Sequence, residues 1–227
     1  MGLFDRFKKK KPQPQPEPSP SAPGWGAITS AFERVYPGQT NPLHVAPAVY
    51  RMYDLSEDAA AYDGVSAYDA GTYWHVVTYG LSELYTKESS QPHSGFGFEF
   101  TLRIPKVSDR PPKWAFQLLD VLGRRVWDGM SLAAGHTIST GPLDGRPSTV
   151  QTALVVIPDP ALPRVLETPH GPLEFLLLVG VEDHVRTQLL EDHERAGDDQ
   201  TAERALARLD AASNYVTPIE HQGGFGG

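Results

Sequence analysis

Apolar and polar residues alternate along several short segments of this chain. The clearest is SGFGFEFTLRI, residues 94–104, in which one side of an extended chain carries Phe96, Phe98, Phe100, Leu102 and Ile104. Because successive side chains of a strand point to opposite faces, the pattern predicts a β-strand over residues 95–104 with one face in the core. Similar patterns predict strands at residues 44–53, 73–79, 149–157 and 173–181. The first contains Pro47, which favours a sheet edge, and the last is apolar on both faces, which favours the sheet centre.

Other segments repeat their apolar residues at helical spacing. Residues 28–36 and 111–128 each predict an amphipathic helix, and residues 183–196 and 201–213 predict two polar helices. A helix, several strands, a helix, two strands and then helices are typical of an α+β fold. The sequence therefore predicts a single layered domain with a mixed, largely antiparallel central sheet flanked by helices.

Two glycines, Gly95 and Gly97, share a predicted strand face with Glu99, Thr101 and Arg103. Glycine inside a strand usually marks a bulge, a bend or the close approach of another backbone. We expect a packed segment of the same chain to lie against them, and the backbone of a partner is the alternative. The opposite, phenylalanine-bearing face is expected to lie in the core under the helix predicted at residues 111–128.

The ends of the chain differ in composition from its middle. Residues 1–23 combine a lysine run with PQPQPEPSPSAP and predict a disordered basic tail with a proline-rich linker. Residues 24–182 are expected to form the domain, and residues 183–227 a helical extension with a glycine-rich end. Weak contact of residues 1–11 with a membrane surface is the alternative to a solvated terminus. The absence of cysteine, of a signal-peptide pattern and of a membrane-spanning apolar run predicts a cytoplasmic protein with no stable membrane insertion.

The charge is unevenly distributed. The chain has a net charge of −8, yet residues 1–23 hold five basic and two acidic residues, so the remainder carries −11. Nucleic-acid binding needs lysine and arginine to neutralise phosphates, so an acidic body argues against it. It favours a basic protein partner instead.

Known catalytic and cofactor patterns do not fit. The glycines of GFGFEF open a strand rather than a helix and lack the third glycine of a dinucleotide-binding turn, and GLSEL lacks the second glycine of a nucleophile elbow. Asp183, His184, Asp192 and His193 lie in an acidic stretch that is typical of a solvated helix face rather than a metal site. No cofactor and no metal are predicted. An enzyme that uses His75 and Glu99 around a cleft is one alternative, and a salt bridge between Glu99 and Arg103 is the structural interpretation of Glu99.

Read together, these segments resemble the amino-terminal domain of the suppressor of fused family. The similar segments follow one another in the order ERVYPGQTNPLHVAPAVY, YDGVSAYDA, YWHVVTYGLSELY, SGFGFEFTLRIP, PPKWAFQLLDVLGRRVW, GHTIS, PLDG and TPHGPLEFLLLVGV. They extend over most of residues 24–182. WHVVTYGLSELY followed by SGFGFEFTLR is the most specific part of the resemblance.

This resemblance implies a non-enzymatic binding protein. Animal members hold zinc-finger transcription factors in the cytoplasm and grip an extended peptide between two halves. Bacterial proteins similar to this domain occur alone and are often predicted to be immunity proteins that neutralise a toxin. Because 46 residues follow Val181, too few for a second half, we expect the single-domain bacterial type without a two-sided clamp.

The leading hypothesis is therefore a bacterial immunity-type inhibitor, and the alternative is a regulatory or scaffold module that binds an extended peptide or a transcription factor. The resemblance places the family's peptide-contacting tyrosine at Tyr85. The acidic residue that assists it has no match, and Glu88 is the nearest carboxylate. The predicted partner-binding set is Tyr79, Tyr85, Glu88, Gly95, Gly97 and Glu99. Strand addition is the expected mode of peptide binding.

Overall fold

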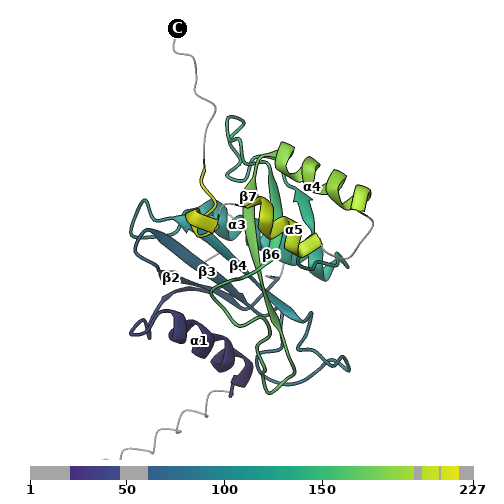
Figure 1. Ribbon diagram of the computed structural model, residues 1–227. Coiled ribbons are helices and arrows are strands. Elements are labelled where there is room, and N and C mark those ends of the chain that lie inside the picture. Colours follow the sequence, from purple (N-terminus) through teal and green to yellow (C-terminus); the bar gives the residue numbers. More distant parts are fainter. Residues whose placement is uncertain (1–20, 47–60, 197–200, 210, 220–227) are drawn as a thin grey trace, which may run out of the picture.

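Seven strands form one sheet in the part of the chain that the computed structural model describes, residues 21–46, 61–196, 201–209 and 211–219 (Figure 1). Their order across the sheet is β1-β2-β3-β4-β7-β6-β5. The pair β4 and β7 is parallel, and the other neighbours are antiparallel. The strands are β1 (Leu43–Val45), β2 (Gly64–Asp69), β3 (Tyr73–Tyr79), β4 (Phe98–Pro105), β5 (Thr137–Ser139), β6 (Ala153–Pro158) and β7 (Glu174–Val181). The predicted mixed, largely antiparallel α+β sheet is confirmed.

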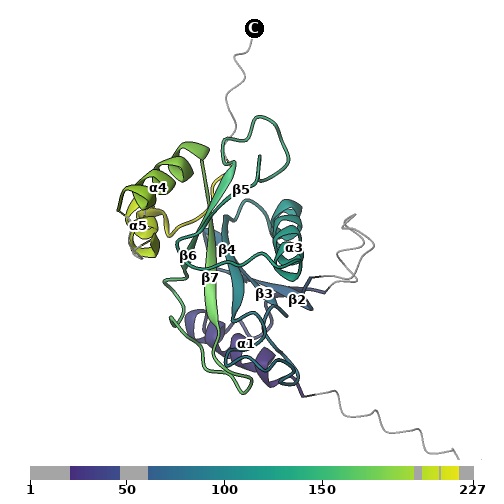
Figure 2. The ribbon, with the colours of Figure 1, turned by 90° about the vertical axis from the view of Figure 1, so that its right-hand side faces the viewer.

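Helices cover both faces of this sheet (Figure 2). On one face lies α3 (Lys113–Trp127). The opposite face carries α1 (Pro23–Val35) over β2 and β3, and α4 (Asp183–Ala196) with α5 (Thr201–Arg208) over β6 and β7. A short 3-10 helix, η1 (Ala211–Ser213), follows α5. Within the described residues, no helix is long and apolar enough to cross a membrane.

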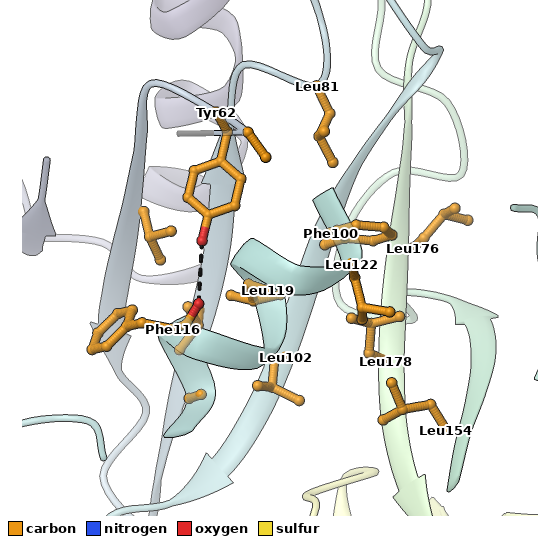
Figure 3. Packing of buried hydrophobic residues seen from close by; sticks show 14 of the residues in the cluster. Tyr62, Leu81, Phe100, Leu102, Phe116, Leu119, Leu122, Leu154, Leu176 and Leu178 are labelled. Carbon is orange, nitrogen blue, oxygen red and sulfur yellow. Dashed lines mark hydrogen bonds between the residues drawn. The ribbon is translucent and has the colours of Figure 1, made fainter. Parts of the chain in front are cut away.

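The largest core lies between α3 and the sheet (Figure 3). Phe100 and Leu102 of β4 pack there against Leu119 and Leu122 of α3. Each such side chain contributes about 1.5–3 kcal/mol when it is fully buried. Phe98 and Ile104 belong to the same cluster, and Phe96 packs at its border. The prediction that this face of the strand lies under α3 is confirmed.

The strand limits depart from the prediction at several points. Strand β4 begins at Phe98 rather than at residue 95, because Gly95 and Gly97 adopt φ values of +54° and +84° that lie outside strand geometry. Strands β2 and β5 were not predicted, and β6 begins four residues later than expected. The helix predicted to reach residue 213 ends at Arg208 and is followed by η1.

Some predictions fall on residues that the structure does not describe. Residues 1–20 of the tail and linker predicted at residues 1–23 lie outside the described residues, as does the end of the glycine-rich segment at 220–227. So does Pro47 together with most of the strand predicted at residues 44–53, of which β1 covers the start. Strand β1 does lie at a sheet edge, and β7 lies between β4 and β6 as expected for a central strand.

Candidate functional site

An open hollow lies beside the loop that joins β3 to β4. It has a volume of about 470 Å³, and we call it the Tyr85 hollow after the tyrosine at its rim. Three segments that are distant in the sequence form it: the residue before β2, the β3–β4 loop and the end of α3. Its principal lining residues are Asp63, Tyr85, Glu88, Gly95, Phe96 and Trp127.

The hollow combines aromatic rings with carboxylates. Tyr85 and Trp127 are 43% and 60% exposed, which is unusual for such large apolar side chains. Trp127 is held in place because its indole N–H donates to the Ala61 carbonyl at 2.6 Å and its ring meets Phe96 edge-on at 4.8 Å. Burial, together with the nearby charge of Asp63, raises the pKa of the Tyr85 hydroxyl, which therefore remains a neutral donor at physiological pH. Such a surface suits a partner with cationic and apolar groups.

Glu99 of β4 anchors the start of the β3–β4 loop, which carries Tyr85. The Glu99 carboxylate is fully buried and accepts the backbone N–H groups of Gly80 and Ser82, each at 2.9 Å, and the Ser82 hydroxyl at 2.7 Å. Its other oxygen accepts the Thr78 hydroxyl at 2.6 Å. Burial raises the pKa of Glu99 to about 7, although these donors oppose the shift. Glu99 therefore fixes the start of the loop in place.

Glu83 folds the next part of the same loop. Its carboxylate accepts the backbone N–H of Glu88 at 2.7 Å and of Ser89 at 2.5 Å, and it pairs with Lys87 at 3.0 Å. Burial acts to raise the pKa of Glu83, but these donors outweigh it and lower the pKa to about 2. The turn from Glu83 to Ser89 thus presents Tyr85 and Glu88 toward the solvent.

Close packing explains the two glycines of SGFGFEF. A Cβ atom on Gly95 would lie 2.5 Å from the Leu81 carbonyl oxygen, and the next residue, Phe96, donates its N–H to that same oxygen at 2.9 Å. A Cβ atom on Gly97 would lie 3.2 Å from the ring of His93. The structure therefore confirms the expectation that a segment of the same chain approaches these glycines.

The six predicted partner-binding residues do not all reach one surface. Tyr85, Glu88 and Gly95 line the Tyr85 hollow, and Gly97 lines an adjacent hollow on the other side of Phe96. Tyr79 and Glu99 are only 1% and 0% exposed, so their prediction as contact residues is corrected. Tyr79 stacks on Trp25 of α1 at 4.2 Å, and Glu99 supports the loop. No sequence pattern indicated Asp63 or Trp127, because only the fold brings these two residues to the hollow.

The structure also contradicts the hypothesis of an enzyme that uses His75 and Glu99 around a cleft. Both side chains are fully buried and belong to separate hydrogen-bond networks. His75 contacts the Tyr36 hydroxyl and Asp159, each at 2.8 Å, whereas Glu99 binds the β3–β4 loop. The interpretation of Glu99 as a partner of Arg103 is wrong as well, because the guanidinium of Arg103 pairs with Asp159. Among the described residues, no group of three His, Cys, Asp or Glu side chains could hold a metal ion.

Comparison with known proteins gives consistent similarities. The family described as "Suppressor of fused protein (SUFU)" matches residues 58–192. The suppressor of fused homologs of Homo sapiens and Mus musculus are each 32% identical to this chain over 173 residues, which is 70% of this chain and 35% of theirs. The chain thus spans about a third of the length of these curated relatives.

Two solved structures are similar to this chain over most of its length. The crystal structure of Drosophila Suppressor of Fused superposes with a TM-score of 0.71 at 28% identity, covering 89% of this chain and 51% of that one. A chain in the Sufu-Fu complex crystal structure superposes with a TM-score of 0.70, also at 28% identity, covering 90% of this chain and 93% of that one.

Proposed function

Because this chain belongs to the suppressor of fused family, we propose that it is a non-enzymatic protein-binding domain whose partner occupies the Tyr85 hollow. The observation that carries the proposal is the exposed aromatic and acidic surface of that hollow. Exposed tyrosine and tryptophan are frequent among the residues that dominate the energy of protein interfaces. The carboxylates of Glu99 and Glu83 hold the loop in one conformation, which lowers the entropy cost of binding.

The charges favour a basic segment of the partner. Asp63 and Glu88 stand at the hollow beside the rings of Tyr85 and Trp127. A lysine or arginine side chain that enters here gains both ion pairing and contact with an aromatic face. The net charge of −8 adds long-range attraction for such a partner, and this attraction weakens as salt rises.

More specifically, we propose that the chain acts in a bacterial cytoplasm as an immunity-type inhibitor of a toxin. Toxins that act on nucleic acids need basic surfaces to neutralise phosphates, and an acidic protein can occupy the same surface. The second candidate is a regulatory module that binds an extended peptide. It is supported by the similarity to the Sufu-Fu complex, in which the partner of Sufu is Fu.

The test is calorimetric titration of the purified chain with two defined proteins: the product of a toxin gene adjacent to its own gene, and the Fu polypeptide of the solved complex. We expect a complex with the toxin that weakens at least about tenfold on Tyr85→Ala, as for a central interface residue. Val107→Ala is the matched control, because Val107 is exposed in a loop that does not line the hollow.

Each outcome separates the hypotheses. Binding to Fu alone would support the regulatory module and exclude the immunity role. A toxin complex that tolerates Tyr85→Ala would keep the function and move the site elsewhere. If neither protein binds, the proposed partners are both wrong.

A further inference from the structure

The sheet ends in an edge strand, β5, whose outer side has no neighbouring strand among the described residues. Two backbone hydrogen bonds flank the pairing of β5 with β6. Val156 donates its N–H to the His136 carbonyl, and Thr140 donates its N–H to the Thr152 carbonyl. In an antiparallel strand, the backbone N–H and C=O groups of successive residues point to opposite sides. The backbone groups of Ile138 therefore point toward β6, and those of Thr137 and Ser139 point away from the sheet. The N–H and C=O groups of these two residues have no hydrogen-bond partner within the described residues.

Hollows flank this edge on both sides. One, of about 270 Å³, lies between α3 and the segment after β5, and the other, of about 530 Å³, lies between β5, the preceding loop and α4. Both are lined by Arg125, Ile138 and Ser139, so they meet at the strand. We call the combined surface the β5 groove and define it by Leu118, Val121, Arg125, Ile138, Ser139 and Leu190.

The walls of the β5 groove are apolar and exposed. Val121 of α3 is 50% exposed and Leu190 of α4 is 42% exposed, although both are aliphatic. Leu118, Val121 and Arg125 are three and four residues apart on α3, so they share one face of that helix. The groove therefore offers aliphatic contacts beside one cationic group.

Arg125 is the charge that is left without a counterpart. It is exposed, and no carboxylate of the described residues lies within salt-bridge distance of it. The neighbouring Arg124 pairs with Asp120 at 3.0 Å, and Asp144 at the far wall is engaged by Arg146 and by the Thr149 hydroxyl. Charge complementarity therefore calls for a carboxylate from the occupant of the groove.

The spacing of these groups matches an extended chain. Side chains four residues apart on a helix face lie about 5–6 Å from one another. Side chains two residues apart on one face of a strand lie about 6.6 Å from one another, twice the rise per residue. A strand laid along β5 would thus set an aliphatic residue against Val121 and a carboxylate, two positions along, against Arg125.

We propose that the β5 groove binds an extended segment of another protein by strand addition, and that this segment carries an aspartate or glutamate two positions from an aliphatic residue. The backbone groups of Thr137 and Ser139 supply the ladder hydrogen bonds, and α3 supplies the side-chain selectivity. A second copy of this chain is disfavoured as the occupant, because pairing two β5 edges would bring two Arg125 side chains to the same interface, where their like charges repel. The Tyr85 hollow shares no lining residue with this groove, so the two sites are tested independently.

The experiment is a titration of the full 15N-labelled chain, followed by amide chemical shifts. The probe is a blocked heptapeptide with the central sequence Val-Thr-Glu-Thr-Val, and the comparison peptide has lysine in place of glutamate. We expect the amide signals of Thr137 and Ser139 to shift, and the glutamate peptide to bind at least tenfold more tightly than the lysine peptide. Arg125→Glu should reverse this preference.

Two further variants test the backbone contacts. Ser139→Pro removes an outward N–H and should weaken binding at least tenfold, whereas Ser139→Ala keeps that N–H and should bind as the unaltered chain does. If Ser139→Pro does not fold, the effect of Arg125→Glu on the preference between the two peptides still tests the proposal. Equal binding of the two peptides, or no shift at Thr137 and Ser139 at millimolar peptide, overturns the proposal. Self-association that Ser139→Pro abolishes would identify a second copy as the occupant and also overturn it.

Discussion

At the scale of single residues, Glu99 links the pH of the solution to the stability of the fold. Burial raises its pKa to about 7 from an ordinary value of 4.5. Between these two values the folded chain holds a proton that the unfolded chain has lost, so stability falls as the pH rises through this range. Both protonation states are accommodated, because the Thr78 hydroxyl lies 2.6 Å from the carboxylate and 3.5 Å from the Phe100 carbonyl and is able to exchange its donor and acceptor roles.

We therefore expect Glu99→Gln to change the pH dependence of stability. The amide does not titrate, so the free energy of unfolding of the variant relative to the unaltered chain should rise by about 2–3 kcal/mol between pH 5 and pH 7. Urea unfolding at a series of pH values measures this difference. Glu88→Gln, which replaces an exposed carboxylate of the same loop, is the matched control and should leave the profile unchanged. A constant offset for Glu99→Gln at all pH values would contradict the account.

The sequence predicted which face each residue of β4 presents, but not what those residues touch. Alternation alone placed Phe98 and Phe100 opposite Glu99, and burial of the phenylalanine face under α3 follows from it. The donors around Glu99 come from the end of β3 and the loop after it, at separations that only the strand pairing sets. Spacing along the chain does not show which loop residues meet in space, so only the family resemblance indicated Tyr85. No pattern indicated Asp63 or Trp127.

At the scale of elements, regular alternation was the signal that predicted strands. The bounds of β3 match the prediction because YWHVVTY combines aromatic and β-branched residues. Strand β2 was missed because GVSAYD contains Gly, Ser, Ala and Asp, which are poor strand formers, yet its position between β1 and β3 buries it. Strand β5 has three residues, too few to show a period.

The segment after η1 is an element that depends on tertiary contacts. Thr217 is fully buried, donates its N–H to the Arg103 carbonyl at 2.7 Å, and accepts the Gly180 N–H on its hydroxyl at 2.8 Å. It therefore fastens the end of the described chain to β4 and β7.

Thr217→Val should destabilise the fold by about 1–3 kcal/mol, because it keeps the side-chain shape and leaves the Gly180 N–H buried without an acceptor. Hydrogen exchange should show faster exchange at Gly180 than in the unaltered chain, and urea unfolding gives the free energy. Thr217→Ser, which retains the hydroxyl, is the control for this loss and should keep the Gly180 amide protected. Equal protection in Thr217→Val would mean that another acceptor replaces the hydroxyl.

At the scale of the whole molecule, a buried ionic cluster joins the two helical groups on one face of the sheet. Asp159, after β6, pairs with Arg103 of β4 and with His75 of β3. His75 also contacts Tyr36 just after α1, and Arg103 donates to the Asn214 carbonyl near η1. Although burial opposes it, the hydrogen bond from His75 and the charge of Arg103 hold the pKa of Asp159 well below its usual range. Burial lowers the pKa of His75, so a neutral imidazole bridges Tyr36 and the carboxylate.

The cluster predicts a strong energetic coupling between Asp159 and Arg103, which surface ion pairs of this protein should lack. Asp159→Asn leaves a buried guanidinium without a counter-charge and should cost about 3–5 kcal/mol, and Arg103→Met should cost a similar amount because it leaves a buried carboxylate. The double variant removes both charges, so it should be less destabilised than the sum of the two by about 1–3 kcal/mol.

Urea unfolding of the four proteins at pH 7.5 measures this coupling. Asp159 should be ionised at this pH, and its contribution should be lost as the pH falls below about 3.8, its ordinary pKa value. The partly exposed surface pair of Asp69 and Lys106 provides the matched cycle, through Asp69→Asn and Lys106→Met, and should couple by less than about 1 kcal/mol. Additive losses at Asp159 and Arg103 would show that solvent reaches the cluster, in which case the helical groups on this face are joined by apolar packing alone.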